Sequence, residues 1–269
     1  ASPEFLFQIQ HSAALGRHAV ATEALAGKLP GTLLLRETGY IWIPSDAGRE
    51  TVCHWCALDL ATAQPSRSSR VTCEGCSGQT HYCSAKGRDE HAPLHQPICA
   101  ILRDAPTLAD RHHCPPDLVR ALLALVAKRA AGLQQSAEPP DRETLHSDPF
   151  DFESSPMAFS QMLGHREAMN SATQRCLRAL AASICSRLPE EMRPPPDLFL
   201  TWAAQINSNA HGLNRANSVT ESFGFGLFPL GAIFNHSCLP NCTYINEGPE
   251  LVFRLLRPVR EGEELCVNY

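Results

Sequence analysis

The sequence predicts an α+β fold in which a split β-rich domain is interrupted by a metal-binding module and a helical region. Runs rich in strand-forming residues occur at 31–44 and again at 242–259. Six of the twelve cysteines fall between Cys53 and Cys99. Apolar residues recur at helical spacing within 115–200. Each β-rich part is too small to form a sheet with its own core, so the two parts are expected to complete one another.

Four parts are expected along the 269 residues. Residues 1–50 form the first part of the split domain, 53–99 the metal module, 100–200 the helical insert, and 201–269 the second part of the split domain. The first part carries "GTLLLRE" and "GYIWIP", two short strands bounded by Gly or Pro. The second part carries "CTYINEGPELVFRLLRPV", which predicts a strand, a Gly-Pro turn and a strand.

The helical insert begins at Pro115-Pro116-Asp117, because proline and an acidic residue favour the first turn of a helix. Further helices are expected over Met157–Leu163, Met169–Leu188 and Asp197–Gln205. A Pro- and acid-rich break from about Glu138 to Pro149 separates the first helix from the others.

Composition excludes several classes of protein. The hydrophobic fraction of 43% is enough for a buried core, and the net charge of −5 argues against strong direct binding to nucleic acid. An acidic balance mildly favours a basic peptide as substrate. No apolar run reaches the ~18 residues of a membrane span, and no signal-peptide pattern is present at the start. Because the chain begins with Ala1, we expect a processed chain or a fragment. We also expect a monomer.

The cysteines point to metal binding in a reducing compartment, the nucleus or the cytoplasm. Two Cys-x2-Cys pairs, Cys53/Cys56 and Cys73/Cys76, each place two thiolates on one ion. Downstream lie four further cysteine and histidine residues, spaced by eight, four and four. On a single helix this spacing places all four side chains on one face. These four are Cys83, His91, His95 and Cys99.

The stretch "GAIFNHSCLPNC" (231–242) gathers amide, imidazole, hydroxyl and thiol groups behind an apolar run. Its local spacing admits a metal site, a ligand-binding turn, or a nucleophile made of Cys238 with His236. The two-residue separation of His236 and Cys238 disfavours the nucleophile. Asn235 and Asn241 also suit a plain turn, because asparagine tolerates left-handed backbone geometry.

The order of the two Cys-x2-Cys pairs, "HYCS" and "PLHQPIC" resembles a MYND zinc finger. The resemblance implies one zinc ion on Cys73, Cys76, His95 and Cys99, and another on Cys53, Cys56, Cys83 and a cysteine four residues later. That last position is Gly87, and Ala92 stands where the family has tryptophan. Either His91 substitutes as the fourth ligand, a water completes the site, or the site is weak. One or two zinc ions are therefore expected.

A MYND finger inside a split β domain resembles the SET- and MYND-domain (SMYD) lysine methyltransferases. The opening "LGRHAVATEALAGKLPGTLLLRE", "CPPDLVRALLALV" and "QINSNAHGL" are similar to family segments. The most specific match is the ordered pair "NHSCLPN" and "GEELCVNY". The fold implied is a SET domain with an inserted MYND finger and an inserted helical region, and the NHSC stretch is expected to pass beneath the C-terminal segment.

The resemblance also implies residue roles. Asn235, the backbone of His236, and Asn209 would bind S-adenosylmethionine (AdoMet), and Arg17 and His18 would lie in the loop that covers it. Two further roles follow from the same motifs, because Tyr269 would be the active-site tyrosine and Cys238 would ligate a third zinc with cysteines beyond the SET core. A buried strand tyrosine is the alternative for Tyr269. Cys242 and Cys266 are expected to be buried apolar groups, and "REGEE" a solvated turn.

The function implied is transfer of a methyl group from AdoMet to a lysine of a histone or non-histone protein. The alternative is a MYND module that captures proline-rich peptides on a SET fold that no longer turns over. The sequence ends at Tyr269, so we expect this stretch alone to bind AdoMet weakly and to methylate poorly.

Overall fold

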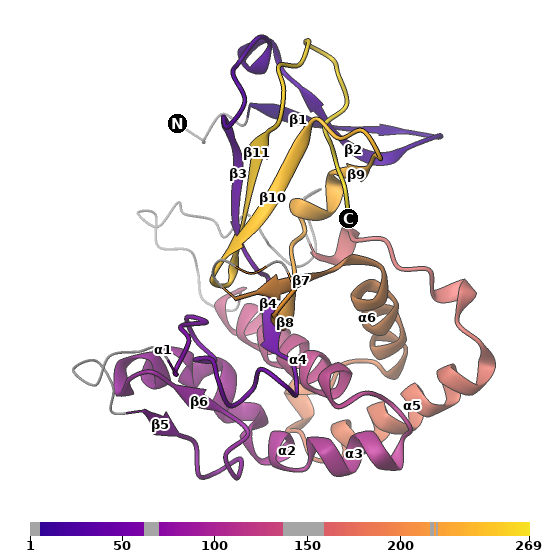
Figure 1. The fold of residues 1–269 in the computed structure, drawn as a ribbon. Coiled ribbons are helices and arrows are strands. Elements are labelled where there is room, and N and C mark those ends of the chain that lie inside the picture. The colour runs from indigo at the N-terminus through magenta and orange to yellow at the C-terminus, as the bar shows by residue number, and fades with distance from the viewer. Residues whose placement is uncertain (1–5, 62–69, 137–158, 216–217, 219) are drawn as a thin grey trace. The chain divides into compact units, whose positions relative to one another are not determined.

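A computed structural model describes residues 6–61, 70–136, 159–215, 218 and 220–269 (Figure 1). The strands are β1 Phe7–Ser12, β2 Gly16–Ala21, β3 Leu33–Thr38, β4 Ile41–Pro44, β5 Val71–Thr72, β6 His81–Tyr82, β7 Ala210–Asn214, β8 Ser222–Leu227, β9 Asn235–His236, β10 Cys242–Glu247, β11 Glu250–Leu255 and β12 Cys266–Val267. The α-helices are α1 Ala85–His95, α2 Cys99–Arg103, α3 Ala105–Arg111, α4 Pro116–Ser136, α5 Ser171–Cys185 and α6 Pro196–Asn209. None of the helices described is long and apolar enough to cross a membrane.

The chain divides into two compact units. The first unit combines residues 1–39 with 228–269, and the second is the continuous stretch 40–227. The first unit therefore joins segments from the two ends of the sequence, as a split β domain requires. The mixed helices and strands agree with the predicted α+β class.

The first unit is built on a three-stranded antiparallel sheet in the order β10-β11-β3 (Figure 1). The hairpin β10–β11 turns at Gly248, whose φ of 63° is a conformation that glycine adopts without strain. Its strands and Gly-Pro turn lie where the sequence predicts them. Pairing of β3 with β11 joins strands from the two β-rich parts in one sheet, whereas β4 of the first part pairs with β8 in the second unit. Beside it stand the antiparallel pair β1–β2 and the parallel pair β9–β12.

Aromatic rings fill the core of the first unit. Phe234 stacks on Phe253 at 4.6 Å between ring centroids and meets Phe7 edge-on at 5.3 Å. All three rings are buried, and such pairs contribute about 1 kcal/mol beyond their apolar burial. Because Phe234 directly precedes Asn235, this packing fixes the start of the NHSC segment.

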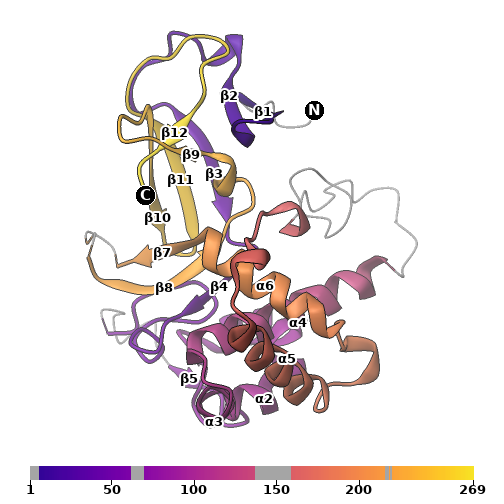
Figure 2. The same cartoon turned by 90° about the vertical axis from the view of Figure 1, so that its right-hand side faces the viewer.

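The second unit packs helices against a three-stranded antiparallel sheet, β4-β8-β7 (Figure 2). Helix α4 contacts β4, α6 and α3, and α5 packs on α6. A proline at the start suits α4, since the missing N–H has no acceptor in the first turn of a helix. The spacing of Leu118, Leu122, Leu125 and Val126 predicts one helical face; the last three are fully buried and Leu118 is half-buried.

The predicted helix ends differ from those observed by a few residues. Helix α5 begins at Ser171, because the side chain of Asn170 accepts a hydrogen bond from Thr173 N and caps it. Helix α6 continues to Asn209, beyond the predicted end. Phe159–Gln161 is a short 3-10 helix within the helix predicted at 157–163. The predicted break at 138–149 and residues 157–158 lie outside the described residues.

The finger region consists of the hairpin β5–β6, α1 and α2. The prediction that Cys83, His91, His95 and Cys99 share one face of a single helix is wrong. Cys83 precedes α1, and a 3-10 turn at Gln96–Ile98 separates α1 from Cys99. Pro97 lacks an N–H group and cannot continue the α-helical hydrogen bonds, which explains the break.

Candidate functional site

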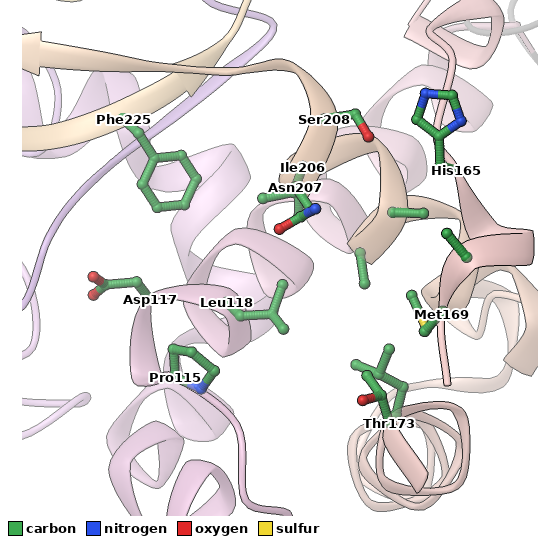
Figure 3. A pocket seen from close by; sticks show the side chains of 14 residues that line it. Pro115, Asp117, Leu118, His165, Met169, Thr173, Ile206, Asn207, Ser208 and Phe225 are labelled. Atoms are coloured by element: carbon green, nitrogen blue, oxygen red, sulfur yellow. The ribbon is translucent and has the colours of Figure 1, made fainter. Parts of the chain in front are cut away.

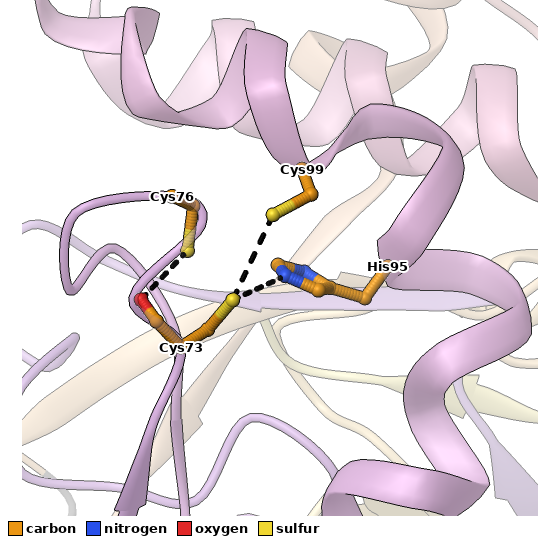
Figure 4. A group of neighbouring side chains, drawn as sticks. All are labelled: Cys73, Cys76, His95 and Cys99. Carbon is orange, nitrogen blue, oxygen red and sulfur yellow. Dashed lines mark hydrogen bonds between the residues drawn. The ribbon is translucent and has the colours of Figure 1, made fainter.

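Four ligand atoms of the finger converge on one point (Figure 4). The Sγ, Sγ, Nε2 and Sγ atoms of Cys73, Cys76, His95 and Cys99 all lie within 4.8 Å of one another. Cys73 Sγ lies 3.7 Å from Cys99 Sγ and 3.2 Å from His95 Nε2. Two thiolates on one tetrahedral zinc ion are about 3.8 Å apart, given a Zn–S distance of about 2.3 Å. The donor set and its spacing therefore fit zinc, and we name these four residues cluster 2.

The elements around cluster 2 explain its geometry. Cys73 and Cys76 flank a tight turn after β5, in which Gly78 N donates to Cys73 O at 3.0 Å. His95 ends α1 and Cys99 begins α2, so the 3-10 turn between them aims both side chains at the same point (Figure 4). Burial raises the pKa of Cys99 to about 12, with the hydrogen bond to Cys73 adding to it. A bound cation would reverse this shift, because zinc ligation requires thiolates.

The same region, 53–99, contains a second group of three thiols, which we name cluster 1. The sulfur atoms of Cys53, Cys56 and Cys83 lie within 4.8 Å of one another, and those of Cys56 and Cys83 are 3.7 Å apart. A hydrogen bond from the Cys56 thiol is the main cause that lowers the pKa of Cys53 to about 5. Cys53 is buried and Cys56 is exposed, so the cluster reaches the surface.

His91 does not join cluster 1. Neither ring nitrogen lies within 4.8 Å of all three sulfur atoms. Its Nδ1 is instead 3.0 Å from the hydroxyl of Tyr82, and its ring lies 5.9 Å from that of Trp55. Burial lowers the pKa of His91 to about 4, so the imidazole is neutral near pH 7. The structure thus brings together seven of the eight predicted zinc-ligand residues, in groups of four and three.

The NHSC segment crosses the C-terminal strand in the first unit. Strand β9 pairs in parallel with β12, with Asn235 opposite Cys266 and His236 opposite Val267. Ser237 N donates to Val267 O at 2.8 Å and extends the pairing. A two-residue parallel pair is weak by itself, so other groups must hold the crossing.

Asn241 is one of those groups. It is 3% exposed, and its amide nitrogen donates to Glu264 O at 2.8 Å and to Glu263 Oε1 at 3.1 Å. Its amide oxygen accepts from Cys266 N at 2.8 Å. Both ends of the amide are satisfied by the C-terminal segment, so Asn241 is a structural link and not a plain turn residue.

Asn235 is held by its amide nitrogen alone. That nitrogen donates to Glu264 Oε1 at 2.8 Å and to Leu15 O at 3.4 Å. No described residue donates to its Oδ1, which leaves an acceptor for a ligand N–H group. The expectation that "REGEE" is only a solvated turn is wrong, since Glu263 and Glu264 bond the two asparagines.

His236 and Tyr269 stand together beside this crossing. Their ring centroids are 5.1 Å apart, and Tyr269 N donates to His236 Nδ1 at 3.4 Å. Tyr269 is 72% exposed, so the alternative of a buried strand tyrosine is wrong. The Tyr269 hydroxyl makes no hydrogen bond to any described residue. On the other side of the imidazole, Cys238 Sγ lies 3.6 Å from His236 Nε2.

Strand β2 carries the other two predicted AdoMet residues of this unit. Arg17 and His18 pair across β1 with His11 and Gln10. His18 is 6% exposed, and its Nδ1 lies 3.0 Å from Gly16 O, so its ring supports the turn between β1 and β2. The expectation that Arg17 and His18 lie in a loop is wrong, because both belong to β2 and pair with β1. Burial lowers the pKa of Arg17. Cys242 is fully buried as predicted, whereas Cys266 is only half-buried.

Sequence analysis did not identify Glu37 as a site residue. Its carboxylate is 2% exposed and accepts from Leu230 N at 2.9 Å and Gly231 N at 2.7 Å. Burial raises its pKa to about 7, although the two backbone N–H groups act against that shift. The available signal was an acidic residue within the apolar run "GTLLLRE". Glu37 anchors the turn that leads into Phe234 and Asn235.

In the second unit, Asn209 ends α6. Its amide nitrogen donates to Leu163 O at 2.6 Å and to Gln205 O at 2.8 Å, which fixes the orientation of the amide. A cavity of about 530 Å³ opens beside the two preceding residues, Asn207 and Ser208 (Figure 3). Its other walls come from α4, α5, α6, the segment 165–169 and Phe225 of β8, and most of these side chains are apolar. Sequence patterns did not indicate this cavity, because its lining comes from several elements.

Known proteins align with this chain over most of its length. The histone-lysine N-methyltransferase SMYD3 of Mus musculus is 29% identical over 252 residues, which cover 91% of this chain and 51% of that protein. Its Homo sapiens counterpart is 29% identical over 89% of this chain and 50% of its own length. Histone-lysine N-methyltransferase ASHR2 of Arabidopsis thaliana is 27% identical over the whole chain and 66% of its own length.

These matches confirm the predicted resemblance to SET- and MYND-domain proteins, and the chain spans about half the length of the two SMYD3 relatives. The family model described as "SET domain" matches residues 50–269. That match covers most of the sequence, including the NHSC segment and the C-terminal "GEELCVNY". The chain belongs to the SET domain family.

Proposed function

We propose that this chain is part of a protein-lysine N-methyltransferase that uses AdoMet and acts on a lysine of a histone or non-histone protein. The observation that carries the proposal is the β9–β12 crossing, which sets Asn235 and the exposed Tyr269 on one unit. The relatives named as histone-lysine methyltransferases align over most of the chain and support it.

The residues of the crossing suit the amino-acid end of AdoMet. An ammonium group requires hydrogen-bond acceptors, and Asn235 Oδ1 and the backbone carbonyl of His236 are of that kind. Arg17 and His18, on β2 of the same unit, would cover the same ligand. When bound, AdoMet supplies an electrophilic methyl group on a sulfonium. The SET residues contribute orientation, which can be worth several kcal/mol.

Tyr269 is proposed to orient the substrate amine. A lysine ammonium has a pKa near 10.4, so the neutral form costs about 4–5 kcal/mol at pH 7. Nearby positive charge and apolar walls lower that cost by disfavouring the ammonium. The exposed Tyr269 hydroxyl is placed to accept or donate a hydrogen bond at the amine nitrogen. No general base is required if the proton leaves to water.

The finger region is proposed to be a MYND finger inserted into the SET domain, followed by an inserted helical region, with domain bounds of 1–50, 53–99, 100–200 and 201–269. Zinc would bind at cluster 2 and, in part, at cluster 1. Trp55 and Leu58 are exposed on the loop of cluster 1, at 38% and 36%. An exposed tryptophan is the kind of surface on which proline-rich peptides dock, so we propose such a peptide as partner of the finger.

Thiolate clusters of this kind persist where thiols stay reduced, so we propose the nucleus, the cytoplasm or both as the location. A histone tail would be a basic substrate for a chain of net charge −5. We expect a monomer that binds no membrane and no nucleic acid strongly.

The proposal is tested with tritiated AdoMet on a panel of histones and cell extract. Wild-type protein is expected to label lysine, at a low rate for this stretch alone. Tyr269→Phe should lower that rate on the order of a hundredfold, because one positioned hydroxyl is lost. Tyr40→Phe is the matched control, because Tyr40 is buried and its ring stacks on Phe159 in the other unit. Equal rates for wild type and Tyr269→Phe would remove the proposed role of Tyr269. Absence of lysine labelling together with peptide capture would favour the scaffold function.

A further inference from the structure

Cluster 1 lacks a fourth protein ligand among the described residues. Its three sulfur atoms lie within 4.8 Å of one another, and no further His, Cys, Asp or Glu joins them. The stretch 62–69 between the two Cys-x2-Cys pairs contains none of those residue types. The question is therefore what completes the coordination of an ion held here, since zinc binds four ligands in such sites.

Local backbone contacts give cluster 1 a defined shape. Cys53 N donates to Leu58 O at 2.9 Å, and Ala57 N donates to Cys53 O at 2.9 Å. His54 N donates to His81 O at 2.8 Å and ties this loop to the strand that ends before Cys83. The three thiols are thus held by backbone bonds, and their spacing fits three corners of a tetrahedron around zinc.

Position 87 is where a fourth side chain would come from. Gly87 lies in the first turn of α1, and Ser84 Oγ accepts from its N–H at 3.2 Å. A Cβ built there would lie 3.5 Å from Trp55 Cδ1 and 3.6 Å from Ser84 Oγ, both ordinary contact distances. Space for a side chain therefore exists beside the Cys53–Cys56 loop, but glycine supplies no ligand atom.

His91 does not fill the gap. Its Nδ1 is engaged with the Tyr82 hydroxyl at 3.0 Å, and its ring packs between those of Trp55 and His95 at centroid distances of 5.9 and 5.8 Å. Moving it to the sulfur atoms would break the hydrogen bond and both ring contacts. Cys56 is exposed, so cluster 1 is open to solvent at that thiol, although Gly87 itself is buried.

We propose that cluster 1 is a three-thiolate zinc site whose fourth position takes an exchangeable ligand from solution, either water or a small thiol. This rests on the proposal that the finger binds zinc. A thiol would bind as thiolate, releasing its proton and displacing the water, because soft sulfur ligands suit zinc. The two ions of the finger then differ, with cluster 2 closed by four protein ligands and cluster 1 open.

The first test is the rate of zinc release to a chromophoric chelator, with total zinc counted by atomic absorption. Wild type is expected to release one ion faster than the other, on the order of tenfold or more, since even outer ligand contacts change metal affinity by that factor. Gly87→Cys supplies the fourth thiolate and is expected to abolish the fast phase. Asp89→Cys is the matched control, because it adds a thiol at an exposed position of α1 two residues away and should keep the fast phase.

The second test replaces zinc by cobalt and titrates 2-mercaptoethanol. The thiolate-to-cobalt absorption band should grow in wild type and Asp89→Cys and stay unchanged in Gly87→Cys. The proposal of an open site would be overturned if wild type released both zinc ions at the same slow rate, or if the cobalt band did not respond to thiol. Either result would leave the finger assignment intact. A folded protein with no zinc would overturn both, while lysine methylation is measured separately.

Discussion

Glu37 is a single buried carboxylate on which the turn before Asn235 depends. Its two oxygens accept the N–H groups of Leu230 and Gly231, at the start of a 3-10 turn. Burial raises its pKa from 4.5 to about 7. The folded state therefore binds a proton more tightly at this site than the unfolded state does.

Stability should fall as the pH rises through that range. The contribution of protonated Glu37 is fully present below the unfolded pKa near 4.5 and is lost as the pH passes about 7. Relative to Glu37→Gln, the unfolding free energy of wild type should drop by about 2–3 kcal/mol between pH 5 and 7.5. Denaturant titrations in excess zinc measure this. Glu261→Gln, at an exposed position, should follow wild type; a constant difference between wild type and Glu37→Gln would refute the shift.

Asn235 offers a second change at the scale of one residue. Asn235→Ala removes the Oδ1 acceptor proposed for AdoMet and should abolish AdoMet binding in calorimetry, while the zinc content stays the same. Asn170→Ala makes the same change at the cap of α5 and should cost about 1 kcal/mol of stability without affecting AdoMet affinity. Unchanged affinity in Asn235→Ala would show that this amide does not hold the ligand.

Among the elements, the crossing of β9 and β12 depends on one amide. Asn241→Ala would leave the N–H of Cys266 without its acceptor. We expect a loss of about 2–3 kcal/mol, because a buried donor without a partner costs that much. Hydrogen exchange should accelerate at the Cys266 amide and much less at that of Leu256, which donates to the Asn241 backbone carbonyl. Equal protection of Cys266 in both proteins would contradict the link.

The finger elements allow a paired comparison of two histidines. His95→Ala removes a ligand of cluster 2, so it should release that zinc ion and unfold 53–99, since structural zinc contributes on the order of 10 kcal/mol. His91→Ala removes only the contacts to Tyr82 and the neighbouring rings and should keep the zinc content of wild type. Zinc counting and limited proteolysis read out both variants. A lower zinc content in His91→Ala would make His91 a ligand after all.

Across the molecule, the sequence was most informative where function depends on neighbours in the chain. The two Cys-x2-Cys pairs predicted the metal clusters, and alternating or apolar runs predicted β3, β10 and β11. It was less informative where partners lie far apart. Glu263 resembles any surface glutamate until Asn241 is placed beside it, and nothing near Glu37 in sequence reveals the N–H groups of the 230–231 turn.

Local sequence patterns also did not predict where the helices end. The spacing of His95 and Cys99 suggested one continuous helix, and both do meet at cluster 2, but Pro97 breaks the helix between them. The geometry of the pair survives because the 3-10 turn still aims both side chains inward. Spacing therefore predicted which residues meet and did not predict the backbone that brings them together.

Strand β3 has a partner that is made much later. It pairs with β11, more than two hundred residues further along the chain. At a synthesis rate of roughly 5–20 residues per second, the ribosome needs on the order of 10–40 s to reach it. During that interval β3 lacks the strand with which it pairs, while residues 40–227 of the second compact unit are being synthesised. The edge of β3 that pairs with β11 therefore stays open for longer than any hairpin in the same unit needs to form.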